Sequence, residues 1–306
     1  MTGRLYIDGS DAYTTFGLIL EDAKGLATYP PMKASSIKTN VWPDEDGEEV
    51  DASGAVLDAR TFQVSFLCLN TDLYQGIYAV LSNGAYHTWN FAELGFSRSL
   101  RVVDFPSYWE MLQRGKFTLT LAQDTPLPGF SRSTPSLSAR DYGFKLDNVN
   151  LASYGIIPTG RTTMHNVMKM PGVKEALKVN VPTVAGQVYD GEEVWYKAKD
   201  VSLNLFLRAP KASFWDHYLT FLYDLSKPGL RSLYVDAITR SFDCYYKKSG
   251  VSLFFVTPTE FCVAFNIVLR FVNFRIDDIV YLLATEAGEF VETEDGTYLI
   301  DMKESL

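Results

Sequence analysis

RLYIDGSDAYTTFGLIL (residues 4–20) and GFKLDNVNLASYGIIPT (residues 143–159) open the two halves of this chain and match one another. With one residue of slippage, six positions of the first stretch fall opposite similar residues of the second: Leu5, Ile7, Asp8, Phe16, Gly17 and Ile19 opposite Phe144, Leu146, Asp147, Tyr154, Gly155 and Ile157. Matching segments at a fixed separation indicate an internal repeat.

The match continues along both halves. The pentapeptide DGEEV occurs at residues 46–50 and again at 190–194. An alternating stretch follows each copy, ARTFQVSFLCL at 59–69 and KDVSLNLFL at 199–207. We therefore predict a first module at 1–124 and a repeat of it at 143–274. Duplication builds surfaces and rings more readily than active sites, so the repeat favours a structural protein.

Apolar periodicity predicts a mainly β fold of the α+β type, with two tandem β-barrel or sandwich modules that each carry a flanking helix. Residues of one parity are apolar in both alternating stretches, which is typical of strands with one buried face: Phe62, Val64, Phe66 and Cys68, then Val201, Leu203, Leu205 and Leu207. A helical stripe follows in each half: Leu73, Ile77, Val80 and Leu81, then Phe214, Tyr218, Phe221, Leu222 and Leu225.

Further elements are predicted from shorter patterns. We expect strands at 16–20, 86–91, 99–103, 116–122, 232–235, 242–246, 251–256 and 260–272, and a short helix over SYWEMLQR, residues 107–114. Residues 125–142 are rich in Pro, Ser and Thr and predict a linker. Residues 275–306 form an acidic C-terminal extension with a hairpin signal around Asp295-Gly296.

Composition restricts the classes of function. The net charge of −9 argues against a nucleic-acid binder held by phosphate contacts, although an acidic lumen that DNA passes remains open. The N-terminus has no secretion signal, and no apolar run is long enough to insert into a membrane. Three scattered cysteines, Cys68, Cys244 and Cys262, predict reduced, buried side chains. We expect synthesis in a reducing cytoplasm.

Catalytic patterns are not found, and we predict no catalytic, cofactor-binding or metal-binding residues. The sequence contains no nucleophile elbow, zinc-protease motif, P-loop or dinucleotide fingerprint. His87 falls in a probable strand, His217 in a probable helix, and His165 in what reads as the loop RTTMHNVMKMPG. Packing or surface roles are the expectation for the first two, and a partner contact remains open for His165.

The acidic run DEDGEEVDASGAVLD, residues 44–58, is the one stretch that resembles a metal-binding loop. Asp44, Asp46 and Gly47 match part of a calcium loop, but one regularly spaced oxygen ligand before the glycine is missing. A solvated turn is the leading interpretation, and a weak cation site stays open. A pair of carboxylates brought together by the fold for glycoside hydrolysis also stays open.

The opening motifs resemble those of phage distal-tail and tail-tube-related proteins. The matching residues are Ile7-Asp8-Gly9 and Phe16-Gly17-Leu18, echoed by Leu146-Asp147-Asn148 and Tyr154-Gly155-Ile156. The resemblance implies a sheet-rich domain that builds rings. Such proteins more typically pair one ring-building domain with an unlike second domain. Two like modules are instead similar to tail hub proteins, in which duplicated tube-like domains let a trimer mimic a hexamer.

The sequence therefore predicts a non-enzymatic structural component of a phage or prophage tail tip, forming a ring between the tail tube and the baseplate. Its expected partners are further copies of itself, in a trimer with pseudo-sixfold symmetry or a hexamer, and the adjoining tube and baseplate proteins in the virion. A glycan-binding or adhesion module is the main alternative, and it requires Trp42, Trp89 and Trp195 to be exposed. The third hypothesis is a hydrolase whose catalytic carboxylates are brought together by the fold.

Overall fold

A computed structural model describes residues 2–69, 71–112, 114–126, 130–175, 178–179, 182–183, 185–186, 188–189 and 194–274. These residues belong to one compact unit that ends at Phe274. The extension at 275–306, with its predicted hairpin, and residues 190–193 of the second DGEEV lie outside the described residues.

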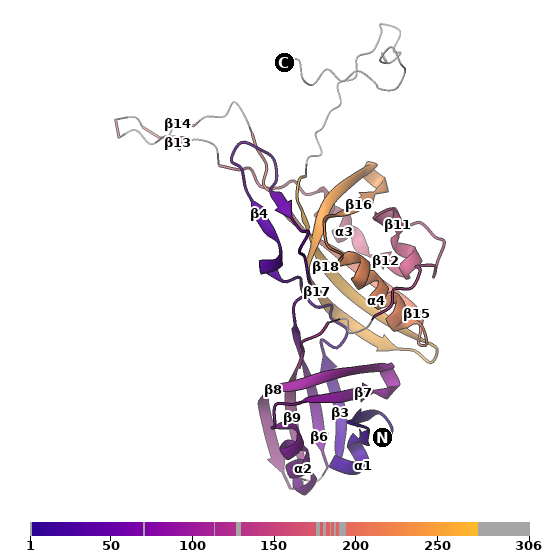
Figure 1. Ribbon diagram of the computed structural model, residues 1–306. Coiled ribbons are helices and arrows are strands. Elements are labelled where there is room, and N and C mark those ends of the chain that lie inside the picture. Colours follow the sequence, from indigo (N-terminus) through magenta and orange to yellow (C-terminus); the bar gives the residue numbers. More distant parts are fainter. Residues whose placement is uncertain are drawn as a thin grey trace. The chain divides into compact units, whose positions relative to one another are not determined.

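The first half builds a seven-stranded sheet with the order β2-β1-β7-β8-β9-β6-β3 (Figure 1). Its strands are β1 (Leu5–Ile7), β2 (Ser10–Asp11), β3 (Leu18–Lys24), β6 (Arg60–Cys68), β7 (Tyr86–Phe91), β8 (Phe96–Met111) and β9 (Arg114–Gln123). Its helices are α1 (Ala12–Phe16), α2 (Thr71–Leu81) and the 3-10 turn η2 (Ala92–Leu94). All strand pairs in this sheet are antiparallel.

The second half builds a seven-stranded sheet with the order β11-β10-β16-β17-β18-β15-β12, which follows the same path position by position. Its strands are β10 (Phe144–Leu146), β11 (Val149–Asn150), β12 (Ile156–Pro158), β15 (Lys199–Pro210), β16 (Arg231–Val235), β17 (Arg240–Val256) and β18 (Glu260–Phe271). Its helices are η3 (Leu151–Tyr154), α3 (Gly160–Met168), α4 (Phe214–Leu225) and η4 (Asp236–Ile238).

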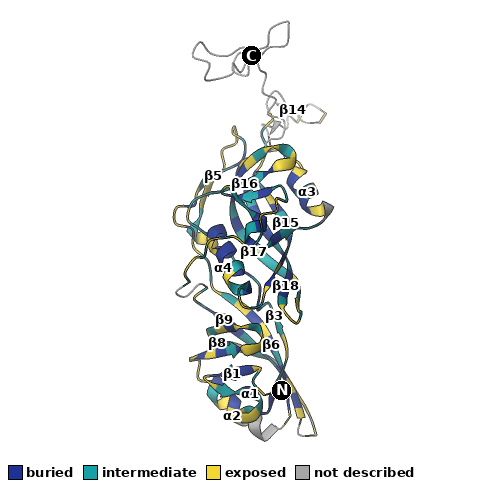
Figure 2. Ribbon diagram, turned by 90° about the vertical axis from the view of Figure 1, so that its right-hand side faces the viewer, coloured by how far each residue is buried: buried dark blue, intermediate teal, exposed yellow. Residues whose placement is uncertain are grey.

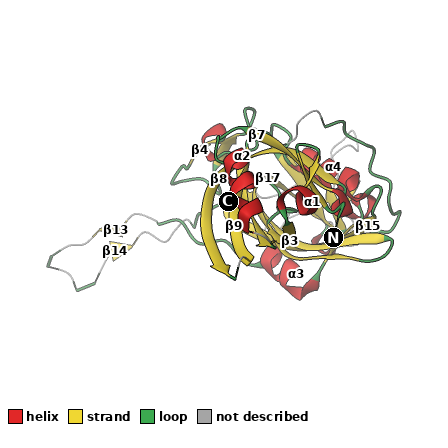
Figure 3. Cartoon of the chain, turned by 90° about the horizontal axis from the view of Figure 1, so that it is seen from below, coloured by secondary structure: helices red, strands yellow, loops and turns green. Residues whose placement is uncertain are grey.

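Two small antiparallel ribbons lie outside these sheets. Strands β4 (Lys38–Asn40) and β5 (Glu49–Asp51) form one, with the 3-10 turn η1 (Ala34–Ser36) before it. Strands β13 (Lys178–Val179) and β14 (Val188–Tyr189) form the other. Strands account for most of the regular structure (Figure 3), which confirms the predicted mainly β fold.

The shortness of one connection makes each sheet curl into a barrel. β2 and β3 are the two edges of the first sheet, yet only residues 12–17 separate them along the chain. A flat seven-stranded sheet is about 29 Å wide at about 4.8 Å per strand, whereas five helical residues advance about 1.5 Å each. The edges must therefore approach one another across α1, and η3 makes the same connection in the second sheet.

The barrel interiors are filled by the residues that the alternation predicted. Phe62, Val64, Phe66 and Cys68 on β6, and all four apolar positions of β15, are buried (Figure 2). Every residue of the predicted α4 stripe is buried too, as are Ile77 and Leu81 of α2. The prediction of one core-packed helix per sheet is confirmed.

Three predicted elements are wrong. Residues 107–111 continue β8 instead of forming a helix, because they pair with β9 up to Met111, opposite Arg114. Pro106 lies where the pairing skips from Asp104 to Ser107, so its missing N–H leaves no gap in the ladder.

The other two errors concern strand limits. Residues 12–16 form helix α1, which Asp11 caps by accepting from the Thr14 N–H at 2.8 Å, and Gly17 ends it with φ +65°. The strand after α1 therefore starts at Leu18 and excludes Phe16. The strands predicted at 242–246 and 251–256 are one strand, β17, which stays paired with β18 through two register shifts.

Candidate functional site

An aspartate at the same position in each half holds the neighbouring strand of its sheet. Asp8 and Asp147 both lie in the hairpin turn after the first strand, with φ of +49° and +47°. The Asp8 N–H donates to Thr88 O at 2.9 Å, and Asp8 Oδ1 accepts from the Thr88 N–H at 2.7 Å. Asp147 repeats both bonds with Ser232 at 2.8 and 2.9 Å. We call each of these arrangements a clasp.

The two clasps differ in the basic side chain that completes them. His87 Nδ1 lies 2.6 Å from Asp8 Oδ2, whereas Arg231 donates to Asp147 Oδ2 at 2.9 Å. Burial acts to raise the pKa of Asp8, but hydrogen bonds from His87 and the Thr88 N–H outweigh it and hold that pKa below its usual value. His87 is buried and occupied by the clasp, so the structure gives it a packing role, as the sequence predicts.

The other titratable candidates lie apart from one another. His165 is exposed and belongs to helix α3, so the predicted loop there is wrong. His217 is half-buried on α4, where burial lowers its pKa although Asp216 acts in the opposite direction. Cys68, Cys244 and Cys262 are buried. Among the described residues, no three His, Cys, Asp or Glu side chains gather as a metal site.

The long connection between β3 and β6, residues 25–59, leaves the first barrel and packs on the second. We call it the strap. Tyr29 is buried against α4, where its ring stacks on Tyr218 with centroids 4.2 Å apart and its hydroxyl donates to Tyr218 O at 2.9 Å. The Tyr218 hydroxyl donates to Ala27 O in return. Further along, the Met32 N–H donates to Lys247 O of β17 at 2.8 Å.

The acidic run lies in the strap, and its residues 46–48 dock on the second half. Asp46 Oδ1 accepts from the Tyr196 N–H at 2.7 Å, and the Gly47 N–H donates to Tyr196 O at 2.8 Å. Glu48 takes two hydrogen bonds from Arg270, at 3.0 and 2.8 Å, with a carboxylate side chain that is only 5% exposed. These hydrogen bonds raise the pKa of Arg270.

The prediction of a solvated turn is wrong for residues 46–48, which contact the second half, whereas Asp44, Glu45, Glu49 and Asp51 are exposed as it expects. Lys174 adds to this contact from the opposite side, since its ammonium donates to Trp42 O at 2.6 Å and to Glu45 O. The carboxylates of Asp46 and Glu48 accept hydrogen bonds from protein donors, the Tyr196 N–H and Arg270. Of the two carboxylates that suggested a cation loop, Asp46 thus helps to hold the strap in place, and Asp44 is exposed.

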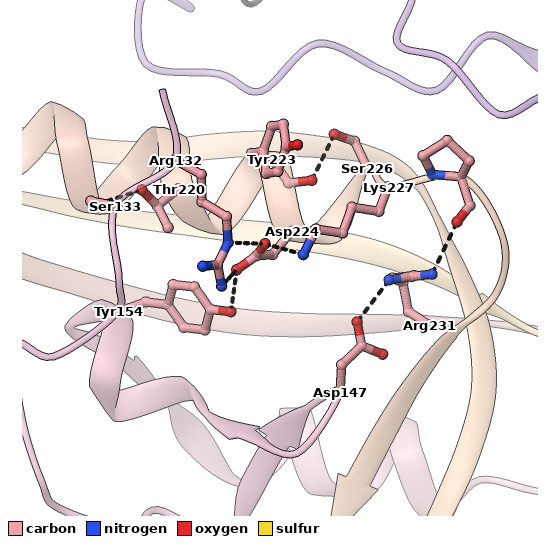
Figure 4. A network of polar contacts seen from close by, with 11 residues as sticks. Arg132, Ser133, Asp147, Tyr154, Thr220, Tyr223, Asp224, Ser226, Lys227 and Arg231 are labelled. Carbon is pink, nitrogen blue, oxygen red and sulfur yellow. Dashed lines mark hydrogen bonds and ion pairs between the residues drawn. The ribbon is translucent and has the colours of Figure 1, made fainter. Parts of the chain in front are cut away.

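The predicted linker also packs on the second barrel. Asp224, 4% exposed on α4, accepts two bonds from Arg132 at 2.7 and 2.8 Å, one from the Tyr154 hydroxyl at 2.7 Å and an ion pair from Lys227 at 2.7 Å (Figure 4). Burial would raise the pKa of Asp224, but these three donors outweigh it and lower that pKa. Residues 130–133 are therefore held on α4, and the Leu137 N–H donates to Ser153 O of η3 at 2.8 Å, so the 130–137 segment does not form a free spacer.

The tryptophans do not form a shared platform. Trp89 lies in the core of the first barrel with no exposed surface, because it points inward from β7. Trp42 is 47% exposed and donates to Glu49 at 3.1 Å. The glycan hypothesis required all three tryptophans to be exposed, and the burial of Trp89 removes one of them.

Exposed apolar side chains lie mainly on the long strands and on the connections. Those exposed by 40% or more are Val41, Trp42, Val56, Leu69, Tyr78, Tyr86, Val103, Trp109, Leu112, Met170, Val173, Val194, Leu253 and Val256. An apolar groove of about 410 Å³ lies between Val56, Phe130 and Tyr223. No helix in the described part of the chain has the length and apolar character to cross a membrane.

Comparison with known proteins gives a weak structural likeness. No family model matches the chain, and no curated protein does. Among solved structures, the chain is similar to the crystal structure of the SPP1 Dit (gp 19.1) protein, titled a paradigm of the hub adsorption apparatus in phages that infect Gram-positive bacteria. The identity is 13% and the TM-score 0.32, over 87% of this chain and 97% of the other.

Proposed function

We propose that this chain is a non-enzymatic structural component of a phage or prophage tail tip, a hub-like ring between tail tube and baseplate. The observation that carries the proposal is the correspondence between the two barrels. They share a strand order, a turn across the closing edge and an aspartate clasp at the same position. A duplicated module of this kind lets three chains supply six near-equivalent units around one axis.

The contacts of the strap support a scaffold role. They hold the two halves together through buried aromatic stacking and an ion pair, at residues that a binding or catalytic site would leave available for a ligand. The opening motifs of both halves, which resemble those of distal-tail and tail-tube-related proteins, agree with this role. The protein would be made in the bacterial cytoplasm and incorporated into the virion tail.

Light scattering at increasing concentration, with negative-stain images of the largest species, tests the proposal. We expect a closed ring with a central hole, built from three chains or from six. A chain that stays monomeric at every concentration, and also in the presence of purified tail-tube protein, would overturn it. Reproducible binding on a glycan array by that monomer would favour the adhesion module instead.

A further inference from the structure

The connection between β12 and β15 contains a copy of the strap's local structure. In the strap, Met32 bridges Leu57, the Lys33 N–H donates to Val56 O at 2.9 Å and the Asp58 N–H donates to Pro31 O at 2.8 Å. We call residues 29–33 with 56–58 the first ladder. Residues 170–174 with 195–197 form the second ladder.

The second ladder has the same contacts at matching positions. Val173 bridges Tyr196, the Lys174 N–H donates to Trp195 O at 2.7 Å and the Lys197 N–H donates to Gly172 O at 2.8 Å. Each ladder leaves its own barrel between the same two strands of the sheet order. The two ladders are thus equivalent parts of the two halves.

The two ladders differ in what covers them. In the first ladder Tyr29 is 2% exposed and Met32 is 8% exposed, because both pack on the second barrel. In the second ladder, the corresponding Met170 and Val173 are 41% and 46% exposed. An apolar face that is buried in one copy of a repeat therefore lies open in the other.

The surface that receives the first ladder also has an open counterpart. The Met32 N–H donates to Lys247 O. Lys247 is a bulged residue of β17, because Tyr246 before it and Lys248 after it pair with consecutive residues of β18. Val103 is the bulged residue of β8, between the pairs of Val102 and Asp104. Each is the seventh residue after the first residue of its strand. Val103 is 49% exposed.

Charges at matching positions are reversed on both sides of this contact. The first ladder has Asp58 where the second has Lys197. The receiving strand has Lys248 in the second barrel and Asp104 at the matching position in the first. Lys197 of the second ladder and Asp104 of β8 therefore carry opposite charges. Asp58 of the first ladder and Lys248 of β17 do so too, with the signs exchanged.

We propose that the second ladder of one copy docks on β8 of a second copy, with Met170 and Val173 packed around Val103 and Lys197 near Asp104. The contact repeats, between chains, the one that the first ladder makes within the chain. It is heterologous, since one copy offers the ladder and the next the strand, so successive copies are related by one rotation, and a ring forms where that rotation closes. The inference rests on the proposed function and specifies the surface by which the ring forms.

Cysteine cross-linking tests the contact directly. Val103→Cys and Val173→Cys are made in separate chains, mixed and oxidised, and the native cysteines are buried. We expect a disulfide-linked dimer from the mixture and little from either variant alone. Val56→Cys, at a 51% exposed position of the first ladder, replaces Val173→Cys as the matched control and is expected to give none.

Charge reversal tests the same contact without oxidation. We expect Lys197→Asp to raise the dissociation constant of assembly roughly tenfold, since like charges then face one another. Adding Asp104→Lys is expected to restore it. Leu253→Asp, at a 54% exposed position of the second barrel, is expected to leave assembly unchanged.

The outcomes separate the two proposals. If a ring forms, but residues 103 and 173 do not cross-link and charge reversal does not change assembly, the proposed contact surface is wrong and the proposed function stands. Absence of both ring and cross-link at the highest concentration would overturn both. A cross-link with charge rescue but no closed ring would support the contact and count against the tail-ring function.

Discussion

The first and second barrels share one sheet plan, yet the described residues cover them very differently. The second barrel receives the strap along β17 and the 130–137 segment along α4. In the first barrel, the strand that corresponds to β17 has an exposed apolar residue, Val103, at the matching bulge. The clasps are common to both barrels.

This difference indicates which features define the module and which join modules. Clasps recur because each one holds the first strand of a barrel to the neighbouring strand of its sheet, and closing turns recur because each one connects the two edges of a sheet. The strap contacts occur once because they connect one half to the other within the chain. Substitutions that affect only contacts within a barrel, or only contacts between the two halves, can therefore test this distinction.

The largest effect is expected at Gly47, where the strap comes closest to the second barrel. Gly47 has φ +73°, and a Cβ there would lie 2.1 Å from Val272 O. We expect Gly47→Ala to reduce the free energy of unfolding by about 3 kcal/mol or more, because backbone must move as well as adopt a strained conformation. Urea denaturation measures the loss.

Gly84→Ala is the matched control for that substitution. Gly84 has nearly the same φ, +71°, but a Cβ there would meet no atom within 4 Å. We expect a loss of about 1–2 kcal/mol, the cost of the left-handed conformation alone. Equal losses of unfolding free energy at the two glycines would mean that Gly47 of the strap does not dock against Val272.

A somewhat smaller effect is expected at Asp224, which fixes the 130–137 segment. Asp224→Asn removes the charge that Arg132 and Lys227 share, and we expect a loss of about 2–3 kcal/mol. Asp200→Asn is the control, because Asp200 is 43% exposed and pairs with Lys247 and Arg270 at the surface. Its expected loss is below about 1 kcal/mol.

The lowered pKa of the Asp224 carboxylate predicts that part of the free energy of unfolding is lost in acid. The pKa of Asp224 is lowered in the folded chain, from an ordinary value of 3.8. Its contribution is therefore fully present above pH 3.8 and is lost as the pH falls through the lower folded value. Unfolding measured from pH 6 to pH 2.5 should show a shallower acid decline in Asp224→Asn. An identical decline would contradict the buried network.

The sequence predicted the elements whose pattern is local and strong. Alternation of period two in β6 and β15 and the helical stripe of α4 follow directly from which residues face the core. The 107–111 segment was missed because Pro106 and Gly115 bracket it in positions typical of a helix, whereas the structure is decided by pairing with β9 across the hairpin. Tertiary pairing overrode local propensity there.

The strap could not be placed from the sequence because its partners are distant along the chain. Glu48 pairs with Arg270, 222 residues away, and no local pattern announces such a contact. The clasps, in contrast, had a visible signal. Asp8 and Asp147 occupy the same position in the aligned openings, followed by Gly9 and Asn148, residues that tolerate the positive φ that both turns require.

The smallest expected effect distinguishes the two clasps from one another. Asparagine keeps one acceptor for the strand N–H and tolerates positive φ, so Asp8→Asn and Asp147→Asn change mainly the contact with the basic side chain. Arg231 keeps its guanidinium charge when its partner carboxylate is lost, with a side chain only 16% exposed, whereas His87 is an imidazole that also lies 3.4 Å from Asn83 Oδ1. We expect a loss of about 2 kcal/mol for Asp147→Asn and about 1 kcal/mol for Asp8→Asn, by urea denaturation at pH 7. Replacing His87 by Arg in the Asp8→Asn background should raise that loss toward the Asp147→Asn value, since a buried guanidinium would then lack its carboxylate. No change on that replacement would mean that the basic side chain does not determine the difference, and that the backbone hydrogen bonds of the clasp carry its stability in both halves.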